Sequence, residues 1–164
     1  MHFIKNSPEE LAAYIKALEQ GLIVFDGRPG AGKSHMARLM QNCVPCEHVA
    51  TDDFIIPQQN TFVGALKFDE LRASVVAGFT RSSLVVLAGV CGRYVVKKAN
   101  LSAKAFVWIE PSSLACLDID ERDFAGDHHA DTTTRHSLYP EVEKYVADYN
   151  ARQELDVVYL NAPD

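Results

Sequence analysis

A loop of small residues carries the strongest chemical signal in the sequence. Residues 27–34 read Gly-Arg-Pro-Gly-Ala-Gly-Lys-Ser and match G-x-x-x-x-G-K-[ST] at every fixed position. Small residues let backbone N–H groups turn inward around a phosphate, and a following helix adds the positive end of its dipole. An apolar run precedes this loop and a helical pattern follows it, as such a loop requires. The sequence therefore predicts a binding site for a nucleoside triphosphate.

Individual positions of this phosphate loop (residues 27–34) have distinct expected roles. Lys33 should reach the β- and γ-phosphates, and the Ser34 hydroxyl should ligate Mg²⁺. Arg28 could equally contact phosphate or lie on the surface. The loop is compatible with ATP or GTP, and we expect ATP and Mg²⁺ as the cofactors. The expected nucleotide-binding residues are Gly27, Arg28, Pro29, Gly30, Ala31, Gly32, Lys33, Ser34 and His35.

Two acids follow the second predicted strand, in Thr51-Asp52-Asp53-Phe54. Ligands of an open α/β sheet bind beyond the carboxyl ends of its strands. An acid there could orient a substrate hydroxyl near the γ-phosphate and accept its proton, which is the base that phosphoryl transfer needs. The alternative is that the acids only cap the next turn. Phe54, and Arg93 just past the third strand, are further candidates for substrate contact, although Arg93 could equally be a surface residue.

These motifs resemble the uridine kinase and nicotinamide riboside kinase group of P-loop kinases. The resemblance rests on the phosphate loop, on Asp52-Asp53-Phe54 and on Phe68-Asp69, and it extends loosely over most of the chain. In that group the first aspartate of a D-D/S-F motif is the catalytic base, which implies Asp52 here. The resemblance also implies transfer of a phosphoryl group from ATP to a hydroxyl of a small molecule, such as a nucleoside or related metabolite.

The sequence departs from this group at two places. The group usually has an acid before the glycine that ends its third strand, where this chain has Ala88-Gly89. Metal binding would then fall to Ser34, water and one of Asp52 and Asp53, and we assign it to Ser34 and Asp53. The group also has an arginine-rich lid, whereas residues 118–137 contain six acids and two arginines, of which Arg122 is the best lid candidate.

These departures keep other functions open. A nucleotide-binding switch or adaptor with weak or no kinase activity is the main alternative. A toxin-like kinase acting on a nucleotide sugar shares the loop pattern, but the short chain gives it little support. A GTPase is disfavoured because no N-K-x-D-type motif follows a strand.

Five apolar runs predict strands at 22–25, 48–50, 84–90, 105–109 and 157–160. Residues 1–21 read as an amphipathic helix, with Ser7 as its cap and Gly21 at its end. Further helices are expected at 33–41, 68–79, 113–121 and 139–153, the last with Pro140 near its start. Strands alternating with helices predict one α/β domain over residues 1–164, with a mainly parallel five-stranded sheet. With the resemblance, this becomes a P-loop NTPase three-layer sandwich with a lid at about 118–137.

Composition restricts the partners. The 164 residues are 48% hydrophobic and 23% charged, with a net charge of −6, which disfavours binding nucleic acid by charge alone. The apolar run at 84–90 is too short to span a membrane, and no secretory leader is visible. Four cysteines do not require a disulfide framework, so we expect a cytoplasmic protein. Its expected partners are a nucleoside triphosphate and a small-molecule acceptor, and a homo-oligomer is compatible with the sequence.

Three weaker patterns have simpler interpretations. Cys43 and Cys46 form one C-x-x-C, for which structural cysteines in a turn are favoured over metal or redox chemistry. Trp108 is expected in the core. A solvated lid is favoured over a metal site for one polar group, which consists of Asp127, His128, His129, Asp131 and His136. A solvated helix face is favoured over a basic site for the other group, which consists of Lys97, Lys98 and Lys104.

Overall fold

Strand β2 (Gly21–Asp26), which leads into the phosphate loop, lies in the middle of a parallel sheet. The computed structural model describes residues 2–57, 61–111, 132–149 and 156–161. The other strands are β1 (His2–Lys5), β3 (Glu47–Ala50), β4 (Leu84–Ala88), β5 (Ala103–Pro111) and β6 (Val157–Asn161). The helices are α1 (Pro8–Ala17), α2 (Lys33–Cys43), α3 (Phe68–Phe79), α4 (Gly92–Lys98) and α6 (Thr132–Tyr149), with 3₁₀ turns η1 (Thr51–Phe54) and η2 (Val63–Ala65).

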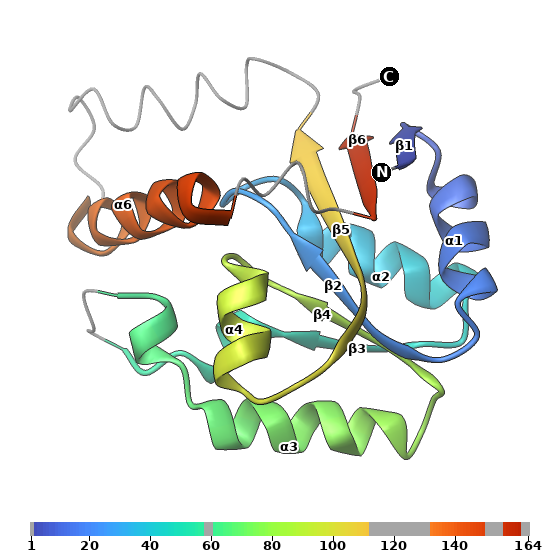
Figure 1. Ribbon diagram of the computed structural model, residues 1–164, viewed down its shortest axis with the longest axis horizontal. Helices are drawn as coiled ribbons and strands as arrows, with labels where there is room; N and C mark the ends of the chain where they lie inside the picture. Colours follow the sequence, from blue (N-terminus) through green and yellow to red (C-terminus); the bar gives the residue numbers. More distant parts are fainter. Residues whose placement is uncertain (1, 58–60, 112–131, 150–155, 162–164) are drawn as a thin grey trace.

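The strand order is β1-β6-β5-β2-β4-β3, and every pairing is parallel (Figure 1). The predicted α/β class is therefore confirmed, but the sheet has six described strands instead of five. The additional strand is β1, which pairs with β6 from His2 opposite Val157 to Lys5 opposite Leu160. Only Ile4 of β1 is buried, so this strand has no apolar run that reveals it in the sequence.

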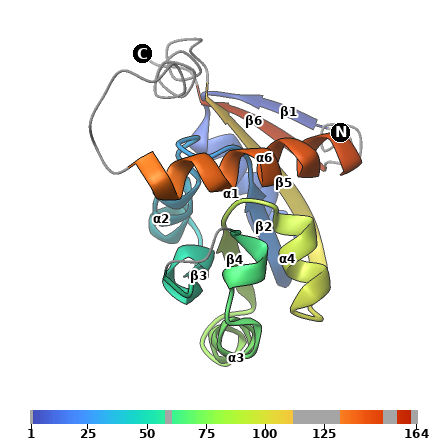
Figure 2. The ribbon, with the colours of Figure 1, turned by 90° about the vertical axis from the view of Figure 1, so that its left-hand side faces the viewer.

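Helices cover both faces of the sheet and give three layers (Figure 2). Along β2, Leu22 and Val24 face a cluster that includes residues of α3, α4 and α6. Ile23 and Phe25 face the opposite cluster, which includes residues of α1 and α2. Burial on both faces explains why this strand reads as a continuous apolar run without alternation.

The bounds of two expected helices differ clearly from the structure. Helix α1 begins as predicted, with the Ser7 hydroxyl accepting from the Glu10 amide at 3.3 Å, but it ends at Ala17. Residues 1–21 are therefore not one helix, and Gly21 starts β2 with φ +127°. Helix α6 begins at Thr132 rather than at 139, so Pro140 lies inside it. The expected helix at 113–121 lies outside the described residues.

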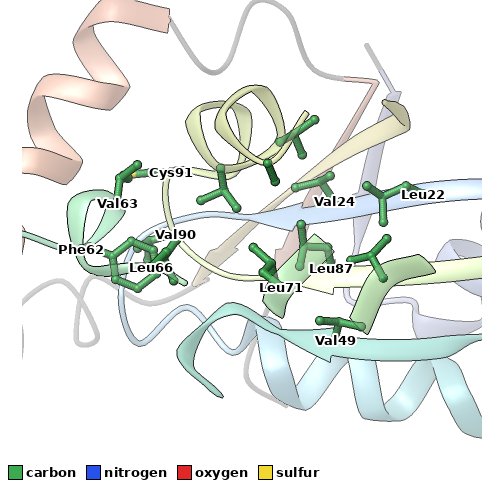
Figure 3. Packing of buried hydrophobic residues seen from close by; sticks show 14 of the residues in the cluster. Leu22, Val24, Val49, Phe62, Val63, Leu66, Leu71, Leu87, Val90 and Cys91 are labelled. Atoms are coloured by element: carbon green, nitrogen blue, oxygen red, sulfur yellow. The ribbon is translucent and has the colours of Figure 1, made fainter. Parts of the chain in front are cut away.

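The core between β2, β3, β4 and the surrounding helices extends to the carboxyl ends of the strands (Figure 3). Phe62, Val63 and Leu66, from the chain after η1, gather there with Val90. Trp108 is 3% exposed, which confirms its place in the core. This apolar end of the core adjoins the phosphate loop.

Candidate functional site

The backbone of the phosphate loop has conformations that glycine adopts more easily than other residues do. Gly27, Gly30 and Gly32 have φ of +147°, +78° and +86°, a region that L side chains rarely adopt. A Cβ at Gly27 would also overlap the carbonyl oxygen of Ile109 on β5. The loop thus passes close against the sheet and enters α2 at Lys33.

The Lys33 side chain folds back onto the loop. It is only 8% exposed, and its Nζ donates to the carbonyl oxygens of Gly27 at 3.1 Å and Arg28 at 2.6 Å. These carbonyls hold the ammonium beside the turn, where an anion bound to the loop would meet it.

A cavity of about 450 Å³ lies against the loop. It joins the phosphate loop and the first turn of α2 to the carboxyl ends of β3 and β4. The loop side consists of Pro29, Gly30, Gly32, Lys33, Ser34 and His35, and the opposite side of Asp52, Ile55, Phe62, Gly89 and Val90. A cation, a hydroxyl, a carboxylate and an apolar wall therefore share one space.

The expected site residues divide into two groups. Lys33, Ser34, His35 and Asp52 line the cavity, as described above. Pro29, Gly30 and Gly32 line it too. Six other candidates among the described residues lie outside its lining: Gly27, Arg28, Ala31, Asp53, Phe54 and Arg93. Asp53 is exposed and acts electrostatically on His48, Phe54 packs against the apolar cluster, and the Arg93 guanidinium lies 4.3 Å from the centre of the Phe106 ring. The lid candidate Arg122 lies outside the described residues.

Arg28 links the loop to α6. Its Nη1 lies 2.6 Å from Oε1 of Glu143, and both side chains are partly exposed. The guanidinium therefore already has an acidic neighbour at the edge of the loop.

Asp26 is a buried acid beneath the loop that the motif does not identify. It is 1% exposed and accepts hydrogen bonds from the Gly27 amide at 2.8 Å, the Gly92 amide at 2.9 Å and the Tyr145 hydroxyl. Burial raises the pKa of the Asp26 carboxyl, although these donors and nearby Lys33 oppose the rise. Burial, together with Asp26, also raises the pKa of Tyr145. The signal in the sequence is an acid that ends an otherwise apolar strand just before the loop.

The side chains near the loop offer few ligands for Mg²⁺. Ala88, where the kinases that the sequence resembles have an acid, is buried at the end of β4, and a Cβ at Gly89 would overlap the Thr51 hydroxyl. Asp26 does not replace that acid, because its carboxylate faces Gly92 and Tyr145. Of the candidate ligands, Ser34 and Asp52 line the cavity and Asp53 does not, so these side chains suit Mg²⁺ held mainly by phosphates and water. No three His, Cys, Asp or Glu side chains in the described ranges are grouped to hold a metal by themselves.

The cysteines and lysines of the weaker sequence patterns lie at ordinary structural positions. Cys43 is exposed at the end of α2, while Cys46 is buried before β3. Burial and nearby Glu47 raise the pKa of Cys46 to about 11, which disfavours thiolate chemistry. Lys97 and Lys98 are exposed in the last turn of α4. The acidic and histidine-rich group at 127–131 and the His136 side chain lie outside the described part of the chain.

Comparison with known proteins shows the fold. The sequence matches no family model and no curated protein. The structure is similar to that of a possible uridine kinase from Bacillus stearothermophilus, with TM-score 0.59, 12% identity, and coverage of 93% of this chain and 96% of that one. It is also similar to a candidate fructose transport system kinase from Silicibacter sp. TM1040, with TM-score 0.55, 12% identity, and coverage of 93% and 98%.

These neighbours confirm the resemblance at the level of the fold. The chain has the architecture of P-loop NTPases, with a glycine-rich loop between the central strand and its helix. Within the described residues, no helix has the length and apolar character needed to cross a bilayer.

Proposed function

We propose that this protein transfers the γ-phosphoryl group of ATP to a hydroxyl of a small molecule. One observation carries the proposal: a single cavity joins the Lys33 and Ser34 side of the phosphate loop to the Asp52 carboxylate. The loop suits the donor phosphates, and the carboxylate stands where an acceptor hydroxyl could approach them. We further propose that the reaction takes place in the cytoplasm.

Each residue has a defined part in this reaction. Lys33 and the loop amides bind the β- and γ-phosphates, and Ser34 would ligate Mg²⁺ with water and one of Asp52 and Asp53. Bound Mg²⁺ would neutralise charge on the phosphate oxygens. Asp52 orients the acceptor hydroxyl and takes its proton as the new oxygen–phosphorus bond forms and the bond from the γ-phosphorus to ADP breaks. We assign Arg122 to stabilise charge on the transferred group.

The wall opposite the loop indicates the kind of acceptor. Ile55, Phe62 and Val90 are apolar, and Asp52 is the acid on this side. An alcohol with one apolar face fits such a wall, and a nucleoside or related metabolite is our first candidate. The names of the two structural neighbours add uridine and fructose to the compounds worth testing.

Acceptor-dependent formation of ADP tests the proposal. The protein is incubated with ATP, Mg²⁺ and a panel of nucleosides and sugars, and the same panel is given to Asp52→Asn. We expect Asp52→Asn to keep ATP affinity and to lower turnover by about 10²-fold or more, because general base catalysis contributes that much. Glu70→Gln, an exposed carboxylate changed to its amide on α3, is the control. Equal turnover in Asp52→Asn and wild type would refute Asp52 as the base.

A second candidate is a nucleotide-binding switch or adaptor. Ala88 at the end of β4 favours it, because the strand beside the loop supplies no acid for the magnesium shell. Under this alternative, the same assay would show hydrolysis of ATP that does not depend on an acceptor, or none at all. Tight nucleotide binding without acceptor-dependent ADP would therefore select the switch.

A further inference from the structure

One carboxylate on α6 holds the chain that forms the apolar wall of the cavity. Glu141 Oε2 accepts from the Phe62 amide at 2.6 Å, and its Oε1 accepts from the Val63 amide at 3.1 Å. The Thr61 hydroxyl lies 3.2 and 3.1 Å from the same two oxygens. The two carboxylate oxygens thus accept hydrogen bonds from three consecutive residues, 61–63, which lie about 80 positions away in sequence.

These contacts fix the start of η2. The first amides of a helical turn have no acceptor within the turn, and Glu141 supplies one from another element. The other end of the segment is paired, since the Ile56 amide donates to the Ala65 carbonyl at 2.8 Å and the Lys67 amide to the Phe54 carbonyl at 2.9 Å. The segment from Thr61 is therefore held between this pairing and Glu141.

Phe62 connects this anchor to the cavity. Its side chain is 2% exposed, belongs to the apolar core and lines the cavity opposite Lys33. Figure 3 shows Phe62 beside Leu66 and close to Val90, another residue of that wall. Because the Phe62 amide bonds directly to Glu141, a shift of that carboxylate would move the wall.

Helix α6 also contacts the opposite side of the cavity. Glu143 pairs with Arg28 in the phosphate loop, and the Tyr145 hydroxyl donates to Asp26 just before it. One helix thus holds both the phosphate side and the apolar wall, and Glu141 is its link to the wall.

We propose that Glu141 is a positioning residue, which sets the place of Phe62 and thereby the affinity of the cavity for the apolar face of its ligand. That this ligand is the acceptor alcohol rests on the function proposed above. Glu141 acts through Phe62 and takes no part in moving protons.

Benzyl alcohol is a suitable probe, because it combines a flat apolar ring with a hydroxyl. Its binding is followed by the NMR shifts of the Ile55 and Val90 methyl groups, in the presence of MgADP. We expect saturable shifts in wild type and a dissociation constant about fivefold or more higher in Glu141→Gln, whose amide offers one acceptor and a misplaced donor. Glu141→Asp, which keeps the carboxylate, should recover part of the affinity, and Glu70→Gln should match wild type.

Two readouts separate positioning from a general loss of structure. The affinity for MgADP should stay within about twofold in Glu141→Gln, because α6 keeps its contacts with Arg28 and Asp26. With an acceptor found by the ADP assay, KM should rise while kcat changes little, the pattern expected when binding is lost equally in the ground state and the transition state.

The outcomes distinguish this proposal from the proposed function. An absent methyl shift in wild type, an unchanged dissociation constant in Glu141→Gln, or an equal loss of MgADP affinity would overturn the role of Glu141. Glu141-dependent binding of benzyl alcohol without any acceptor-dependent ADP would support Glu141 and refute the kinase.

Discussion

Asp26 joins three parts of the molecule through one side chain. Its carboxylate accepts from the phosphate loop at Gly27, from the first turn of α4 at Gly92 and from α6 at Tyr145. The Gly27 amide therefore points to Asp26 and not toward a ligand of the loop. A buried carboxylate is costly unless such donors surround it, so this site fixes where the loop leaves the sheet.

Removal of this carboxyl should change how stability depends on pH. Burial raises the pKa of Asp26 in the folded protein above its usual 3.8. As pH rises above 3.8, the carboxyl of the unfolded chain therefore loses its proton before that of the folded protein does. The protonated Asp26 carboxyl therefore contributes its whole stabilisation below pH 3.8, and this stabilisation is lost as pH rises through the folded-state pKa. Asp26→Asn removes this dependence.

Urea unfolding of wild type and Asp26→Asn from roughly pH 4 to pH 8 measures the effect. The free energy of unfolding of wild type, minus that of Asp26→Asn, should fall as pH rises. The slope is the readout, because the amide also changes the hydrogen bonds by a pH-independent amount. A difference that rises with pH would mean that the donors lower the pKa more than burial raises it.

At the scale of elements, β3 and β4 meet the site through Thr51 and Gly89. Thr51 is buried at the start of η1, and its hydroxyl occupies the space where a Cβ on Gly89 would lie. The end of β4 can approach η1 this closely only because position 89 has no side chain. The same approach places Asp52 and Gly89 on one wall of the cavity.

A methyl group at position 89 should therefore destabilise the protein in a way that Thr51 can relieve. We expect Gly89→Ala to cost about 1–3 kcal/mol of unfolding free energy, as overpacking of a core does. Thr51→Ala should recover part of this loss, with a coupling energy of about 0.5–3 kcal/mol in a double-mutant cycle. Additive effects of the two substitutions in denaturant unfolding would argue against a direct contact.

Elements with strong local patterns were predictable, and those formed by distant contacts were not. The apolar runs at 22–25 and 84–90 contain central strands, of which β4 ends at Ala88, because both faces of each strand are buried. Strand β1 exists because its backbone pairs with β6, more than 150 residues later, and one buried side chain gives no pattern. The start of α6 at Thr132 was also not predictable, because the stretch before Pro140 is mainly polar and gives no apolar pattern.

The candidate site divides in the same way. A local motif specifies Lys33 and Ser34, and the strand-end rule brings Asp52 near them. Glu141 and Tyr145 act across the fold, on residues about 80 and 119 positions away, so no local spacing indicates them. Their roles depend on the course of α6 over the carboxyl end of the sheet, which only the structure shows.

At the scale of the whole molecule, binding of nucleotide should raise the stability of the chain. The cavity touches segments that follow β2, β3 and β4, so a ligand that fills it holds these strand ends together. A ligand at 100 times its dissociation constant stabilises the folded state by about 2.7 kcal/mol, or about 5–10 °C in Tm for a chain of this size. We expect MgATP to produce such a shift in wild type.

Lys33→Ala should lose most of this shift, because it removes the cation that the loop holds beside the phosphates. Lys16→Ala, an exposed lysine at the end of α1, should keep it and controls for the loss of one positive charge from an acidic protein. Thermal unfolding with and without MgATP, repeated at two salt concentrations, gives the comparison. A shift of equal size in Lys33→Ala and Lys16→Ala would mean that the nucleotide binds by general charge or elsewhere, and the phosphate loop would then not be its site.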